Sequence, residues 1–70
     1  MNGAQFIKRI KRLGRQNGIA VRLDAEHGKG SHGRLYYGSA FTTVKDRKKE
    51  IGRSLLAAMC RQLGVRPTDI

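Results

Sequence analysis

The spacing of the apolar residues changes twice along this 70-residue chain, and no other feature constrains its fold as strongly. In residues 2–17 the apolar side chains recur at the intervals of an amphipathic helix. In residues 19–24 the large apolar residues fall at every second position, as in a strand with one buried face. Helical spacing returns at Ile51 and continues to Leu63. The sequence therefore predicts a helix, then strands, then a second helix.

Three short segments between the helical patterns predict three strands. The first covers about residues 19–24, the second 32–37 and the third 40–44, which is rich in Thr, Phe and Val. Gly38-Ser39 is a candidate two-residue turn between the last two strands. Residues 25–31 form a glycine-rich polar connection between the first two strands.

The first helix is expected over about residues 3–17 and the second over about residues 52–63. Asn2 with Gln5 three positions later is a weak form of the capping box that begins helices. Gly14 is unusual within the last turn and is a position where the first helix could end early.

The order α-β-β-β-α predicts an α+β fold, because two helices can cover one face of a three-stranded antiparallel sheet. The opposite face of the sheet would stay open to solvent or to a partner. A chain of 70 residues suits one small domain, residues 1–70, with a thin core.

The charge of the chain points to a polyanionic partner. Lys and Arg number 15 against 5 Asp and Glu, for a net charge of +10. Such a surface attracts nucleic acids through their phosphates, which fits an RNA-directed enzyme and a ribosomal or chromatin-type packing protein equally well. A single cysteine, Cys60, cannot form an intrachain disulfide and is expected to be a small core residue, so we predict a cytoplasmic protein. No apolar run approaches a membrane span or a signal peptide.

Strand alternation places chemically useful residues on the open face. Leu35 and Tyr37 would face the core, whereas His32, Arg34 and Tyr36 would share the opposite face. The neighbouring strand could add Arg22 and Asp24 beside them.

This set of residues suits RNA cleavage. Histidine is a common general acid or base in enzymes, so His32 could transfer protons to or from the reacting oxygens. Arg34 or Lys29 can stabilise the phosphate charge, while Gly30 lets the backbone approach a phosphate closely. Tyr36 offers a ring on which a base can stack. By residue chemistry alone, an ordinary surface role for His32 remains the alternative.

Two other motifs do not fit their usual context. Gly28-x-Gly30-x-x-Gly33 matches the dinucleotide fingerprint, but it precedes a strand instead of a helix in a βαβ unit. The two histidines and one cysteine match no common metal-ligand spacing. We therefore predict no cofactor, and any cleavage is expected to be independent of metal.

The chain resembles the HicA toxin family from about Phe6 to Val65. The resemblance rests on the basic first helix and on three motifs in order. These are Lys29-Gly30-Ser31-His32, Thr42-Thr43-Val44 and Leu63-Gly64-Val65.

The resemblance implies a fold similar to the double-stranded-RNA-binding domain and a catalytic role for His32 in the Gly30-Ser31-His32 motif. It also implies cleavage of messenger RNA, arrest of translation, and a HicB-type antitoxin that covers the active site. Many members have a proline and a second histidine just after the third strand, whereas this chain has Lys45-Asp46-Arg47. Lys45 or Arg47 could replace that histidine as a cation.

Two alternatives remain open at the level of sequence. One is a non-catalytic double-stranded-RNA-binding or ribosome-associated module, which would bind RNA and leave it intact. The other is an interaction protein whose basic surface meets an acidic partner.

Overall fold

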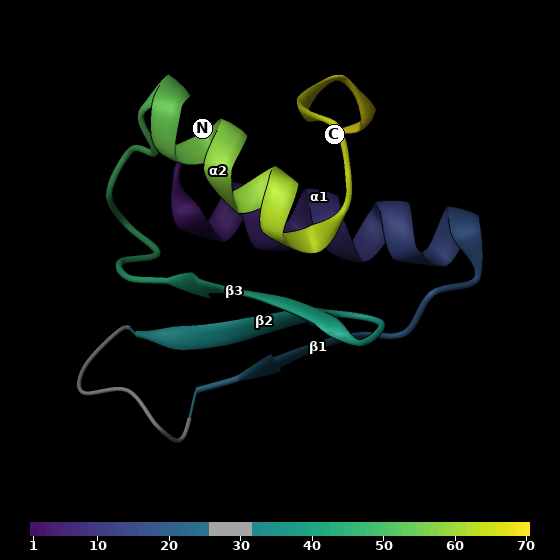
Figure 1. The fold of residues 1–70 in the computed structure, drawn as a ribbon. Coiled ribbons are helices and arrows are strands. Elements are labelled where there is room, and N and C mark those ends of the chain that lie inside the picture. Colours follow the sequence, from purple (N-terminus) through teal and green to yellow (C-terminus); the bar gives the residue numbers. More distant parts are fainter. Residues whose placement is uncertain (26–31) are drawn as a thin grey trace.

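Two helices cover one face of a three-stranded antiparallel sheet, and the other face is open (Figure 1). The computed structural model describes residues 1–25 and 32–70. Its elements are α1 (Gly3–Asn17), β1 (Val21–Asp24), β2 (Gly33–Tyr37), β3 (Ala40–Val44), α2 (Arg53–Leu63) and the short 3-10 helix η1 (Pro67–Asp69). The predicted α+β class and α-β-β-β-α order are confirmed.

The sheet has the order β1-β2-β3, with both neighbouring pairs antiparallel. Its register sorts the side chains into cross-strand rows. On the open face, one row holds Arg22, Tyr36 and Phe41, and the next holds Asp24, Arg34 and Thr43. The alternate positions Leu35, Thr42 and Val44 are buried beneath the helices.

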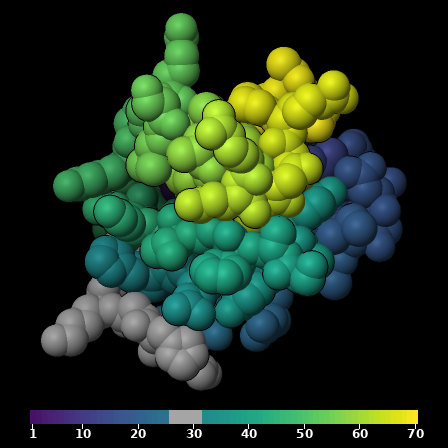
Figure 2. Space-filling model, viewed as in Figure 1, coloured from purple at the N-terminus to yellow at the C-terminus, as the bar shows by residue number. Residues whose placement is uncertain are grey.

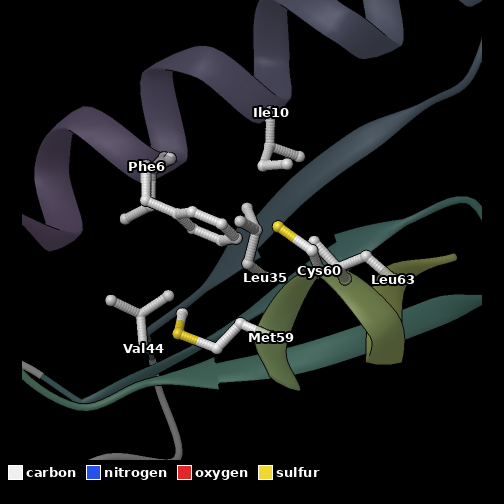
Figure 3. Packing of buried hydrophobic residues seen from close by; sticks show 8 residues of the cluster. Phe6, Ile10, Leu35, Val44, Met59, Cys60 and Leu63 are labelled. Atoms are coloured by element: carbon white, nitrogen blue, oxygen red, sulfur yellow. The ribbon is translucent and has the colours of Figure 1, made fainter. Parts of the chain in front are cut away.

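The core lies between the helices and the covered face of the sheet. Phe6 and Ile10 of α1, Leu35 of β2 and Cys60 of α2 have no exposed surface. Figure 3 shows these side chains converging from the two helices and the sheet. Leu35 therefore anchors β2, as the alternation of its sequence predicted.

Tyr37 lies at the edge of this core, on the side predicted for it. Its ring packs against the core cluster, and its hydroxyl oxygen accepts a hydrogen bond from Asn17 Nδ2 at 3.0 Å. This bond ties the end of β2 to the end of α1. The neighbouring Tyr36 belongs to the open face, so the two adjacent tyrosines have different surroundings.

The predicted capping box at the start of α1 is present. The Asn2 side chain accepts a hydrogen bond from the Gln5 amide, and the Gln5 side chain accepts one from the Asn2 amide. The helix continues through Gly14 to Asn17 instead of ending early. Gly14 is buried against Val21, and a Cβ there would lie 2.7 Å from the Ile19 carbonyl oxygen.

Two strands begin later than the sequence predicted. β1 starts at Val21 instead of residue 19, because the Ile19 amide donates a hydrogen bond to the Gly14 carbonyl at 2.8 Å and so belongs to the end of α1. β2 starts at Gly33, which pairs with Val44 at the end of β3. His32 therefore lies one residue before the strand. Among residues 1–25 and 32–70, no helix is long and apolar enough to cross a membrane.

Candidate functional site

His32 is exposed at one end of the sheet, where β2 begins and β3 ends. The neighbouring Gly33 pairs with Val44, the last residue of β3, which brings His32 next to the connection that follows β3. In Figure 2 the teal start of β2 and the green connection after β3 meet at the same end of the molecule. His32 therefore lies beside residues that are more than ten positions away in the sequence.

His32 lines a surface hollow of about 420 Å³, which we call the histidine hollow. Lys45 and Lys49 line it together with Asp46 and Glu50. Leu55 and Met59 of α2 and Val44 of β3 contribute an apolar wall. This volume is within the range of about 300–1,000 Å³ typical of small-ligand pockets, so the hollow can hold part of a nucleotide chain.

Contacts with the N-terminal residues hold the polar wall of the hollow in place. The Lys49 carbonyl accepts a hydrogen bond from the Gly3 amide at 3.3 Å, and the Ile51 amide donates one to the Met1 carbonyl at 2.8 Å. The carboxylate of Glu50 forms an ion pair with the Met1 ammonium. The backbone that carries Lys49 is therefore fixed by α1 and the residue before its N-cap.

Both carboxylates of the hollow have partners. Glu50 is paired with the Met1 ammonium, and an Asp46 oxygen accepts a hydrogen bond from the Lys48 amide at 2.9 Å. The Met1 ammonium offsets the charge of Glu50, whereas the Lys48 amide is a neutral donor to Asp46. With Glu50 paired to the N-terminus, the lining holds two lysines, Lys45 and Lys49, against Asp46, a balance that suits a phosphate group.

The open face carries two arginines stacked on two aromatic rings. The guanidinium carbon of Arg22 lies 4.5 Å from the centroid of the Tyr36 ring, and that of Arg34 lies 5.1 Å from the centroid of the Phe41 ring. The two ring centroids are 5.6 Å apart. These four residues form one contiguous group, which we call the arginine–aromatic face.

The structure brings three predicted site residues together on this face and separates the fourth. Arg22, Arg34 and Tyr36 are neighbours, whereas His32 lies at the end of the sheet in the histidine hollow. The sequence predicted a strand from residue 32, whereas β2 begins at Gly33, so His32 lies one residue outside the strand that carries Arg34 and Tyr36. Thr43 lies on the open face and also lines the hollow, so the two surfaces are continuous.

Phe41 is a candidate site residue that the sequence argument missed. It is 45% exposed, which is unusual for a phenylalanine in a small domain. The alternation of residues 40–44 could have identified it. If Thr42 and Val44 face the core, Phe41 must face the open side of the sheet. Lys45 follows β3 and lines the same hollow as His32.

Three predicted site residues, Lys29, Gly30 and Ser31, lie outside the described residues, as do His27 and Gly28. In the remainder of the chain, no three His, Cys, Asp or Glu side chains gather as metal ligands would. Comparisons with protein-family models, with curated proteins and with solved structures give no match.

Proposed function

We propose that this protein is a metal-independent endoribonuclease that cleaves messenger RNA in the cytoplasm, as the toxin of a HicA–HicB-type system. The observation that carries the proposal is the position of His32, exposed in a hollow that Lys45 and Lys49 also line. A side chain of the type most often used as a general acid or base thus lies beside cations that can bind a phosphate.

The chemistry needs only these groups, the RNA and solvent water. The 2′-hydroxyl loses its proton, and its oxygen forms a bond to the adjacent phosphorus. The bond from phosphorus to the 5′-oxygen breaks, and this oxygen gains a proton. His32 supplies one of these two proton transfers and solvent water the other, while the lysines stabilise the negative charge that builds on the phosphate oxygens. The products are a 2′,3′-cyclic phosphate and a 5′-hydroxyl.

The charge of the chain supports RNA as the substrate. A net charge of +10 attracts a polyanion at long range, and the arginine–aromatic face extends that attraction to one side of the histidine hollow. In this proposal Lys45 and Lys49 take the place of the second histidine that many HicA proteins carry after the third strand. Arg47 was the other candidate replacement from the sequence. In the part of the chain that the structure describes, it is not among the residues that line the hollow.

The decisive experiment compares His32→Ala with His27→Ala on a messenger RNA substrate. Removal of one acid–base group typically lowers the rate about 10²- to 10⁴-fold, so His32→Ala should lose cleavage to this degree. His27→Ala is the matched control, because it removes a histidine of the same chain and should retain activity. Since His32 is exposed, its variant should melt at the wild-type temperature. Undiminished cleavage by folded His32→Ala would contradict the proposal.

Two further measurements define the reaction. EDTA should leave the rate unchanged, and a 2′-deoxy substitution at the cleaved nucleotide should abolish cleavage there, since the attacking hydroxyl is gone. A non-catalytic double-stranded-RNA-binding or ribosome-associated module is the alternative, and the arginine–aromatic face suits RNA binding without cleavage too. Wild-type protein that binds RNA with a steep salt dependence and leaves it intact would favour that alternative.

The proposed antitoxin is a HicB-type partner that covers the histidine hollow. An acidic protein encoded by the neighbouring gene should form a complex with the toxin and stop cleavage. Adding it to wild-type protein and RNA, and following intact RNA on a gel, tests this part. A neighbour that binds while cleavage continues would exclude the proposed covering of His32.

A further inference from the structure

The arginine–aromatic face has a composition that the core of a small domain does not require. Phe41 is 45% exposed on the uncovered side of the sheet, and the fold already has its core on the other side. Its ring lies 5.6 Å from the ring of Tyr36, and an arginine stacks on each of them. Two aromatic rings and two guanidinium planes are thus gathered on one accessible surface.

We propose that the arginine–aromatic face is a stacking platform for unpaired bases, so that the protein selects single-stranded RNA. Aromatic rings and guanidinium planes are the groups on which splayed bases stack, while Arg22 and Arg34 also provide charge for the backbone. Bases inside a duplex are stacked on each other and cannot reach these rings. The inference deepens the proposed function and rests on it for the reaction, but the binding can be tested separately.

The charge of this face favours a nucleic acid. Asp24 is the one acidic residue of β1, β2 and β3, against Arg22 and Arg34 on the same side. Asp24 lies in the cross-strand row of Arg34 and Thr43, which is next to the row that contains the two stacked rings. The rings themselves are thus flanked by cations, as a platform for bases with phosphates requires.

The platform leads to the proposed reaction centre. Phe41, Thr43 and Lys45 follow one another at alternate positions along β3 and past its end, and the last two line the histidine hollow. At the rise of a strand, Phe41 and Lys45 are about 13 Å apart. A short single strand can therefore stack a base on Phe41 while a phosphate farther along it reaches Lys45 and His32.

Binding is measured with the cleavage-blocked His32→Ala protein, full length, so that RNA stays intact. The probes are a short fluorescent single-stranded RNA and a duplex RNA of the same length. Phe41→Leu retains an apolar side chain but removes the ring, and it should weaken single-strand binding about 5- to 150-fold, the range of one lost base stack. Duplex binding should stay unchanged, and so should the salt slope for the single strand, because no charge is removed.

Two control variants separate stacking from other effects. Arg34→Lys retains the charge but removes the guanidinium plane, so it should weaken single-strand binding without changing the salt slope. Ile19→Ala truncates an exposed apolar residue outside the strands and should bind like the parent protein. Since Phe41 is partly exposed, its variant should fold, and a thermal melt verifies this.

An equal loss of single-strand and duplex binding in Phe41→Leu would overturn the platform, and so would unchanged single-strand binding. Loss of binding to an acidic protein partner alone would overturn it as well and would assign the face to protein recognition. If wild-type protein leaves RNA intact while Phe41→Leu selectively loses single strands, the ribonuclease proposal fails and the platform stands.

Discussion

Cys60 carries the only thiol of the chain, and the thiol is completely buried between the helices and the sheet. Burial, and to a smaller degree the charge of Asp69, raises the pKa of the Cys60 thiol above its ordinary value. A raised pKa in the folded state means that the fold favours the neutral thiol. This contribution to stability is complete below the ordinary cysteine pKa of about 8.5 and is lost as pH rises through the higher folded value.

We therefore expect the free energy of unfolding to decrease above about pH 8.5 in part through Cys60. Urea denaturation of wild type and Cys60→Ala between pH 7 and pH 10 measures this, because the variant retains the other titrating groups. The stability difference between the two proteins should narrow as pH rises. A difference that stays constant over this range would show that ionisation of the thiol does not affect folding.

His32 and Tyr36 illustrate how far residue-level reasoning reaches. The Tyr36 side chain lies on the face that alternation assigned to it, because β2 is paired on both sides and its pleat is regular there. His32 differs because it is one residue beyond the last pair, Gly33 and Val44. Periodicity predicts a side chain's direction only where the ladder of hydrogen bonds continues.

At the scale of elements, the close packing of β1 against α1 depends on a glycine in the helix. Gly14 is buried in the last turns of α1, where β1 approaches so closely that a Cβ would meet Val21 and the Ile19 carbonyl. A glycine there costs helix propensity of about 1 kcal/mol relative to alanine. The sequence shows this cost, but the compensating contact appears only when the helix and the strand are packed.

Gly14→Ala should therefore destabilise the protein, despite the better helix propensity of alanine. Overpacking typically costs about 1–3 kcal/mol, which exceeds or offsets the gain in propensity. Gly52→Ala is the matched control, because a Cβ at Gly52 meets nothing within 4 Å and its φ is −65°. Gly52→Ala should lose about 1 kcal/mol or less, because alanine is a poorer N-cap residue than glycine but meets no steric contact there. Urea unfolding of both variants decides the matter, and a more stable Gly14→Ala would contradict the close packing.

For the whole molecule, charge and shape act together. The chain has a net charge of +10, and the two surfaces that meet at Thr43 both carry cations, which in the proposed function bind one RNA strand. The arginine–aromatic face contributes Arg22 and Arg34, and the histidine hollow contributes Lys45 and Lys49. Binding of single-stranded RNA should therefore depend strongly on salt.

Each cation that meets a phosphate adds about −0.7 to the slope of log K against log salt for a single strand, so four predict about −2.8. Fluorescence anisotropy of His32→Ala with a labelled single strand at several salt concentrations measures this slope. Lys45→Ala should reduce its magnitude by about 0.7, whereas Lys48→Ala, on the same connection but outside the described lining of the hollow, should leave it unchanged. A slope near zero would exclude a phosphate-binding surface.

The sequence by itself determined the element order, the class of fold and most of the core positions, although Leu55 and Ile19 fit the apolar spacing and are 51% and 38% exposed. These follow from local periodicity, because apolar residues recur once per turn in a helix with one buried face and at every second residue in a strand. It also determined which side of the sheet Arg22, Arg34 and Tyr36 occupy. The positive charge that favours a polyanion was equally visible in composition.

Tertiary structure alone decided what surrounds His32. The connection after β3 reaches it because Gly33 pairs with Val44, and the N-terminal residues fix that connection through hydrogen bonds from Gly3 and Ala4. The grouping of Phe41 with Tyr36 likewise depends on the β2–β3 register. Such contacts join residues far apart in sequence, and no local pattern encodes the register or the packing that creates them.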